Sequence, residues 1–218
     1  MLVIDKTNRL VYIVSMQSTD ISPQKSRRSA GPLRSTQSKT AILQAAIQVA
    51  QDDGYAAASI EKIARRAGAG KQTIYRWYGS KAALFVDAYA AIVPVEALEK
   101  STGDAEADVT FVLTALFKIY NETAAGIILS GLVGASAEDP GTAGQIRAGL
   151  MVGRGNVLRN PLDRAIAEGN LPRDFCVETA IETVIALVWH RLLTAPNGLD
   201  AAGAGVIARR AIACGGIH

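Results

Sequence analysis

A chain of 218 residues is long enough for one large domain or two small ones, and 49% hydrophobic residues favour a folded globular protein over a disordered chain. The net charge of +3 is unevenly distributed. Residues 25–81 hold eleven Lys and Arg against three acids, whereas residues 82–218 hold ten against fifteen. We therefore expect a basic amino-terminal third that contacts a polyanion and an acidic remainder that contacts proteins or small molecules.

Signals for export and membrane insertion are absent from the sequence, and we expect a cytoplasmic protein without a membrane partner. The apolar run at residues 10–15 has no cleavage site of small residues after it, so it is not a signal peptide. No window reaches the roughly 18 uninterrupted apolar residues of a membrane span. Cys176 and Cys214 lack CxxC spacing, which fits a reducing compartment. Met16 offers an alternative start, so whether residues 1–15 are translated stays open.

The sequence shows no signature of an enzyme, and we expect no catalytic residues, cofactor or metal site. His190 and His218 have no Cys, Asp or Glu at metal-binding spacing, and no Ser lies in a GxSxG context. The GRGN segment at residues 153–156 lacks the glycine count and the preceding strand of a dinucleotide loop.

In chain order, the first expected element is a flexible basic arm. Residues 22–38 are rich in Ser, Pro, Arg and Lys and contain no acid, and we place the end of the arm at residue 37. A solvated tail without a binding role is the alternative interpretation.

Four short helices are expected next, because apolar residues recur at three- and four-residue intervals. The first starts at Thr40 and ends at Asp52-Asp53-Gly54, and the second follows a Ser59 cap and ends at Gly68. Gly70 caps a third helix that Gly79-Ser80 ends, and the fourth begins at Lys81.

Beyond residue 94 the pattern is coarser but still helical, and the expected fold is all-α. Gly, Pro and Asp-Pro signals separate helices near residues 105–120, 124–137, 142–168, 175–195 and 200–214. Pro161 falls inside the third of these, where it predicts a kink.

The segment GAGKQT at residues 68–73 resembles the end of a phosphate-binding loop, but its context excludes one. A GxxxxGK[ST] loop ending at Lys71 needs glycine at position 65 and Ser or Thr at position 72, where the sequence has Arg65 and Gln72. Such a loop also follows a strand, whereas residues 60–67 are predicted to be helical. Helix, glycine-bearing turn and short helix are instead typical of a helix-turn-helix, whose second helix enters the DNA major groove.

The third helix carries the chemistry that this interpretation needs. Ile74, Trp77 and Tyr78 form its inward face. The opposite face presents donors that reach base edges or phosphates: Lys71, Gln72, Thr73, Tyr75 and Arg76. Gln pairs with adenine and Arg with guanine in bidentate fashion. An ordinary solvated helix face is the alternative.

Two helices in succession place a lysine at the positive end of the helix dipole, Lys71 after Gly70 and Lys81 after Ser80. A bound phosphate would offset this unfavourable placement, since helix starts are natural anion sites. We predict phosphate contacts from Lys71, Lys81 and Tyr75 and from the helix starts at Thr40 and Ser59.

The segment from Thr40 to Phe85 closely resembles the amino-terminal domain of the TetR family of bacterial transcriptional repressors. The resemblance rests on Gly54-Tyr55, Ser59-Ile60, Ile63-Ala64, Ala67-Gly68, Thr73-Ile74-Tyr75 and Ser80-Lys81-Ala82-Ala83-Leu84. It implies an all-helical homodimer in which three helices bind DNA, a fourth links to an effector-binding domain, and two late helices of each subunit form a four-helix interface. The implied domains are an arm at residues 1–37, a DNA-binding domain at 38–84 and an effector-binding and dimerisation domain at 85–218.

The resemblance implies base or phosphate contacts from Lys71, Gln72, Thr73, Tyr75, Arg76, Trp77 and Lys81. The candidate DNA contacts also include Arg34 in the basic arm and the helix starts at Thr40 and Ser59. Trp77 shares the face of Ile74, so a core or mixed role is its alternative. Ala69-Gly70 stands where the family usually has Val-Ser, which removes a side-chain cap from the recognition helix. A weaker likeness to the carboxy-terminal domain of one TetR subgroup covers residues 159–165, 168–172 and 190–193.

The effector is expected to be an unidentified small molecule in an apolar cavity of the second domain. Its candidate lining is Phe111, Phe117, Tyr120, Met151 and Trp189, although a plain core role is the alternative for each. The candidate dimer contacts are Val184, Val188, Arg191 and Ile207, and a buried core helix in a monomer is the alternative.

These expectations combine into a dimeric regulator of transcription that binds a palindromic operator in double-stranded DNA. We expect a repressor that a small-molecule effector releases from the operator. The alternative is a helical small-molecule-binding or protein-interaction module whose DNA binding is vestigial.

Overall fold

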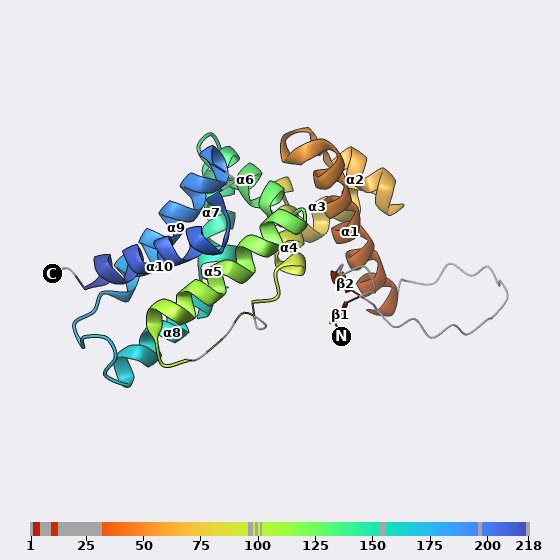
Figure 1. Ribbon diagram of the computed structural model, residues 1–218. Helices are drawn as coiled ribbons and strands as arrows, with labels where there is room; N and C mark the ends of the chain where they lie inside the picture. The colour runs from red at the N-terminus through yellow and green to blue at the C-terminus, as the bar shows by residue number, and fades with distance from the viewer. Residues whose placement is uncertain are drawn as a thin grey trace.

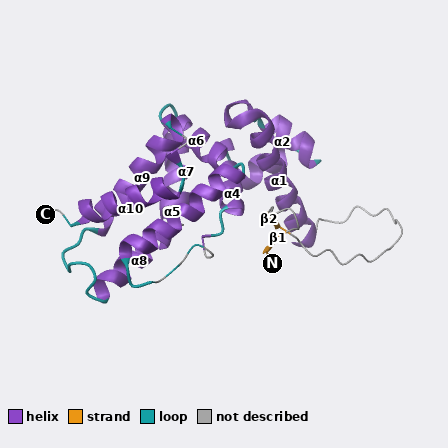
Figure 2. Ribbon diagram, viewed as in Figure 1, coloured by secondary structure: helices purple, strands orange, loops and turns teal. Residues whose placement is uncertain are grey.

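The computed structural model describes residues 2–4, 10–12, 32–95, 98, 100, 102–152, 156–195 and 198–216. Helices joined by loops make up almost all of this structure (Figures 1 and 2). The exception is an antiparallel hairpin of β1 (Leu2–Ile4) and β2 (Leu10–Tyr12), in which Leu2 lies opposite Tyr12. The expected all-α class is confirmed. In Figure 1, helices α1–α3 form one group, α5–α10 form the other, and α4 lies between them.

The amino-terminal group, with the linking helix, consists of α1 (Pro32–Ala57), α2 (Ile60–Ala67), α3 (Lys71–Tyr78) and α4 (Lys81–Ile92). Helix α1 begins within the segment that we expected to be a flexible arm. Proline suits the first turn of a helix because its missing N–H would have no partner there. Gly54 leaves the helical conformation at φ 77° and ψ 162°, as the Asp-Asp-Gly sequence indicated.

The caps around α2, α3 and α4 agree with the sequence. The Ser59 hydroxyl accepts the backbone N–H of Lys62, and the Ser80 hydroxyl accepts that of Ala83. Gly70 is the N-cap of α3 and makes no side-chain hydrogen bond. Gly68 ends α2 in the left-handed conformation, where its N–H reaches two carbonyls of the last turn.

The second group of helices packs α10 against both α5 and α9. Its helices are α5 (Ala105–Glu122), α6 (Ala125–Ser136), α7 (Pro140–Ile146), α8 (Asn156–Ala167), α9 (Val177–Thr194) and α10 (Ala201–Gly215). Among the described residues, no single helix has both the length and the apolar character to cross a membrane. Helices α5 and α6 reach that length and apolar character only when they are taken together, and they are bent by 94° relative to each other.

The single helix expected at residues 142–168 is wrong. Residues 140–146 form α7, Arg147–Val152 form a π-helical turn (η2), and α8 begins at Asn156. Within η2, a Cβ atom at Gly149 would overlap the side chain of Val86, so η2 packs closely on α4. The kink expected at Pro161 stays a prediction, and Pro161 itself is buried inside α8.

The two groups of helices meet around Tyr55, at the end of α1. Its ring lies 5.0 Å from that of Phe85 on α4, measured between centroids. On α6, a Cβ atom at Gly131 would overlap the Cβ atom and ring of Tyr55, so α1 and α6 touch at this glycine. Burial raises the pKa of Tyr55, and the charge of Asp139 adds to the shift. Tyr55 therefore joins the amino-terminal helices to the second group of helices.

Candidate functional site

The outward face of α3 presents the polar side chains expected there. Lys71, Gln72, Tyr75 and Arg76 are exposed, with half of the Tyr75 surface accessible, whereas Ile74 is completely buried. The prediction that Gln72 and Arg76 stand clear of their own protein is confirmed. Thr73 and Trp77 are half-buried, and Trp77 packs against the core, which fits the core or mixed role left open for it.

Helix α2 is held to the end of α1 by two ion pairs. Lys62 Nζ lies 2.9 Å from Asp53 Oδ2, and an Arg66 guanidinium nitrogen lies 2.6 Å from Asp52 Oδ2. Both pairs are exposed, so their main effect is to orient side chains rather than to stabilise the fold. The two pairs fix the position of the Lys62 and Arg66 side chains beside α3.

Lys71 pairs across the turn with Glu61 of α2. Its Nζ lies 2.6 Å from Glu61 Oε1, and about half of each side chain is accessible. The hydrogen bond from Lys71 lowers the pKa of Glu61, assisted by a backbone hydrogen bond. An exposed pair of this kind exchanges readily with another anion, so Lys71 is available to a phosphate.

Lys81 occupies a different environment, because its ammonium lies at the carboxyl end of α1. Nζ donates to the backbone oxygens of Tyr55 at 2.6 Å and Ala56 at 3.3 Å, and it lies 4.3 Å from the centre of the Tyr55 ring. Burial lowers the pKa of Lys81. From the sequence, we expected a bound phosphate to offset the unfavourable position of Lys81 at the positive end of α4. In the structure, the partial negative charge at the carboxyl end of α1 also offsets it.

The other predicted DNA contacts are differently placed. Thr40 lies inside α1, eight residues after Pro32, so the expected helix start at Thr40 is wrong and its amide belongs to a continuous helix. Its side chain is exposed. Ser59 does begin a helix, and its hydroxyl is used as the cap. Arg34 lies near the start of α1, and its side chain is outside the described residues.

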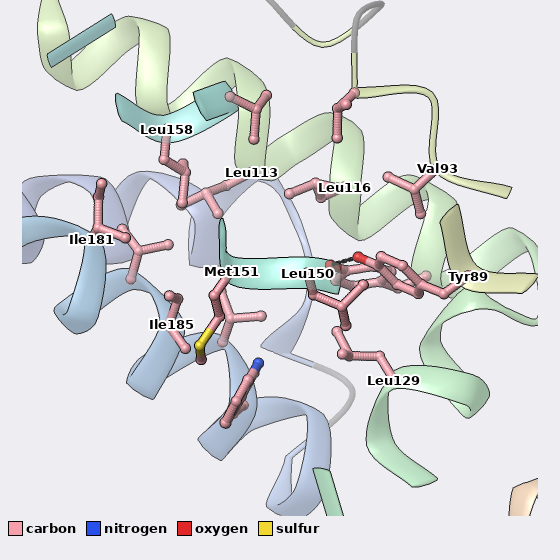
Figure 3. A pocket seen from close by; sticks show the side chains of 16 residues that line it. Tyr89, Val93, Leu113, Leu116, Leu129, Leu150, Met151, Leu158, Ile181 and Ile185 are labelled. Carbon is pink, nitrogen blue, oxygen red and sulfur yellow. Dashed lines mark hydrogen bonds between the residues drawn. The ribbon is translucent and has the colours of Figure 1, made fainter. Parts of the chain in front are cut away.

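The second domain contains an apolar cavity of about 160 Å³ between α4, α5, α6, η2, α8 and α9 (Figure 3). Its lining consists of Tyr89, Val93, Val95, Leu113, Leu116, Tyr120, Leu129, Leu150, Met151, Val157, Leu158, Ile181, Val184, Ile185, Val188 and Trp189. The hydroxyls of Tyr89 and Tyr120 form a buried hydrogen bond of 2.8 Å at its wall.

Three of the five predicted lining residues, Tyr120, Met151 and Trp189, lie at this cavity. The other two do not. Phe111 is 39% exposed on the surface, 4.7 Å from Lys100 Nζ, and Phe117 is buried in the core outside the lining. Phe111, Phe117 and Tyr120 point in different directions around α5, and the sequence alone did not show which side of this helix faces the cavity. Tyr89 was missed because we interpreted α4 only as a link.

Three of the four predicted dimer contacts require correction, and the fourth, Arg191, stays a prediction. Val184 and Val188 are buried and line the cavity, and Ile207 is completely buried in the core, so none of them is available to a partner. Arg191 is half-buried and donates to the Gly198 carbonyl at 2.9 Å. The apolar stripe of α9 thus packs on its own domain, because a helix buries its most hydrophobic face first.

The fold and the α3 surface define a helix-turn-helix DNA-binding protein with a second helical domain. The family described as bacterial regulatory proteins, tetR family, matches residues 42–88. The family described as tetracyclin repressor-like, C-terminal domain, matches residues 99–211. The chain belongs to the TetR family of transcriptional regulators, which is a family of transcription factors and not an enzyme class.

Several known proteins are similar along most of their length. YdeS of Bacillus subtilis (strain 168), named an uncharacterized HTH-type transcriptional regulator, is 28% identical over 153 residues, 70% of this chain and 77% of that protein. The crystal structure of the TetR family regulator SCO0332 is 28% identical, with a TM-score of 0.66 over 84% of this chain and 99% of that one. FadR of Bacillus subtilis, solved with stearoyl-CoA, shares the fold at 19% identity and a TM-score of 0.60, over 82% of this chain and 99% of that one.

Proposed function

We propose that the protein is a dimeric repressor that binds a palindromic operator through α3 and leaves it when a small molecule fills the apolar cavity. The observation that carries this proposal is the exposed row of donors on α3, with Ile74 buried behind it. Gln72 and Arg76 are suited to base edges, and Lys71 and Tyr75 to phosphates. Two copies related by a twofold axis would place two α3 helices about 34 Å apart, in successive major grooves.

The cavity is connected to the DNA-binding helices through η2 and α4. Leu150 and Met151 of η2 line the cavity, while the neighbouring Gly149 packs directly against Val86 of α4. A ligand that displaces η2 therefore displaces α4, and the Lys81 contact links the start of α4 to the end of α1. A change in the spacing of the two α3 helices would lower operator affinity.

For the dimer, the exposed side of α9 and α10 is the favoured surface. Leu193 on α9 is 51% exposed and Val206 on α10 is 38% exposed. Large exposed apolar side chains on neighbouring helices are suited to a self-complementary interface.

The decisive experiment is a gel-shift competition on the DNA that flanks the protein's own gene. A palindromic site that resists excess random duplex is the expected result. Uniform weak binding to every duplex would instead support the alternative, a helical binding module with vestigial DNA recognition.

The two lysines give a sharper prediction. Lys71→Ala and Lys81→Ala are each expected to reduce the slope of log affinity against log salt by about one, because each removes one phosphate contact. The Lys81 ammonium has three N–H donors. The carbonyls of Tyr55 and Ala56 accept from two of them, so the third can donate to a phosphate. Titrations of an operator duplex at several salt concentrations measure the slopes.

Only the Lys81 variant is also expected to lose stability, by about 1 kcal/mol, since its carbonyl contacts are partly buried. Thermal unfolding of the two variants provides the comparison. An unchanged salt slope for Lys81→Ala would assign this lysine to the fold alone.

The volume and the apolar lining of the cavity indicate the size and the charge of the effector. FadR of Bacillus subtilis binds stearoyl-CoA, a long acyl chain with a charged nucleotide. The cavity of this chain measures about 160 Å³ and has an apolar lining, so we infer a smaller effector without a phosphate group.

A further inference from the structure

Taking the cavity as the effector site of the proposed function, we propose that its ligand is an uncharged, ring-sized apolar molecule with one hydrogen-bonding group, such as a small alkylphenol or aryl alcohol. Three features of the cavity lead to this class: its size, its polar pair and the absence of charge among the described residues that line it.

Size limits the ligand to about one ring. The cavity of about 160 Å³ is close to the 150 Å³ or so of an engineered Leu-lined and Phe-lined cavity in another protein, which stays dry and binds benzene. Leu113, Leu129 and Leu158 contribute such walls, as Figure 3 shows. Met151 also lies on the lining, and its flexible thioether can adapt to small differences in ligand shape.

The polar group is directed to one end of the cavity. The Tyr89 and Tyr120 hydroxyls meet there at 2.8 Å, and a dashed line marks this bond in Figure 3. Either hydroxyl can be the donor of that bond, so the pair can rotate to donate to a ligand oxygen or to accept from a ligand hydroxyl. Leu116 and Val93, which also line the cavity, have no polar atom in their side chains, whereas Trp189 carries an indole N–H that can only donate.

The cavity disfavours both a negatively and a positively charged ligand. None of the described lining residues is Lys, Arg, His, Asp or Glu. A carboxylate or ammonium group would lose its hydration without gaining an ion pair, which costs far more than one hydrogen bond to tyrosine returns. Burial raises the pKa of Tyr120 well above its usual value, so the Tyr120 hydroxyl stays neutral at physiological pH.

The test compares three probes of one shape: p-cresol, toluene and p-toluate. Calorimetric titration of the full-length protein without DNA gives each affinity. We expect p-cresol to bind about fivefold more tightly than toluene, the value of one net hydrogen bond, and p-toluate to bind at least tenfold more weakly than p-cresol. Binding of p-toluate as tight as that of p-cresol, or no binding of p-cresol, would overturn the proposal.

Variants of the hydroxyl pair locate the binding site. In the double variant Tyr89→Phe/Tyr120→Phe, the affinity ratio of p-cresol to toluene is expected to fall to about one, because neither hydroxyl of the pair is left. Should the double variant fail to fold, each single variant is expected to change the ratio, since the remaining hydroxyl has lost its partner. A ratio that stays at about five in a folded variant contradicts the assignment. For size, 4-octylphenol is expected to bind more weakly than p-cresol, and tighter binding would contradict the one-ring limit.

Operator release is measured separately, so the two proposals can fail independently. If p-cresol binds in calorimetry but leaves the operator complex intact in gel shift, the ligand class stands and its role as a releasing effector is wrong. If a carboxylate ligand of the cavity releases DNA while p-cresol neither binds nor releases it, the ligand class is wrong and the repressor function stands.

Discussion

The double substitution of Gln72 and Arg76 by alanine is expected to abolish discrimination between the operator and random DNA. Both side chains are exposed on α3, behind which Ile74 anchors the helix in the core. Each bidentate pair between a side chain and a base contributes about 1–3 kcal/mol of discrimination, which corresponds to roughly 5- to 150-fold for each residue. Competition of labelled operator against random duplex, at one fixed salt concentration, measures the ratio.

The matched control is Arg173→Ala, which removes an exposed arginine from the second domain. It changes the net charge like Arg76→Ala and leaves α3 intact, so the ratio of specific to non-specific binding should not change. Both variants should melt near the temperature of the parent protein, because exposed substitutions usually change stability by less than about 0.5 kcal/mol. A double variant that keeps its preference for the operator would contradict the assignment of α3 as the reading helix.

The second large effect is expected at the contact between the two groups of helices. In Gly131→Ala, the new Cβ atom would overlap the Cβ atom and ring of Tyr55. Rotation of the tyrosine cannot relieve this clash, because its Cβ atom is fixed to the backbone of α1. Overpacking of a core costs about 1–3 kcal/mol, and about 2 kcal/mol lowers the melting temperature of a chain of this size by roughly 4–8 °C.

Gly134→Ala is the matched control, since it lies in the same helix and a Cβ atom there meets nothing within 4 Å. That variant is expected to gain about 0.5–1 kcal/mol, because alanine loses less backbone entropy than glycine in a helix. Thermal unfolding followed by circular dichroism compares the two. Equal melting temperatures for both variants would contradict the prediction, because α1 and α6 would then accommodate the new Cβ atom without loss of stability.

The local sequence was sufficient to predict the helix-turn-helix. Apolar spacing and cap residues predicted α2, α3 and the start of α4, including the Ser59 and Ser80 caps and the N-cap Gly70 without a side-chain hydrogen bond. These signals act within one or two turns of helix, so no distant contact is needed to interpret them. The exposure of Gln72 and Arg76 followed from the same periodicity.

Predictions that depended on distant contacts succeeded less often. The π-helical turn η2 contains Gly149, which packs on Val86 of α4, a contact that joins residues far apart in the chain. Likewise, the carbonyls that accept from Lys81 lie at the end of α1, and dipole reasoning from neighbouring residues did not include them. Helical periodicity identified an apolar stripe on α9 but not the surface that covers it.

The sequence by itself thus determined the helical class, the helix-turn-helix and the donors on α3, because each depends on hydrogen bonds and burial within a few residues. Only the tertiary structure decided that Val184 and Val188 line a cavity, that Tyr89 joins Tyr120 at its wall, and that Lys81 contacts the end of α1. The physical reason is that an amphipathic helix specifies which of its faces is buried, whereas the neighbour on that face is chosen by the packing of the whole chain.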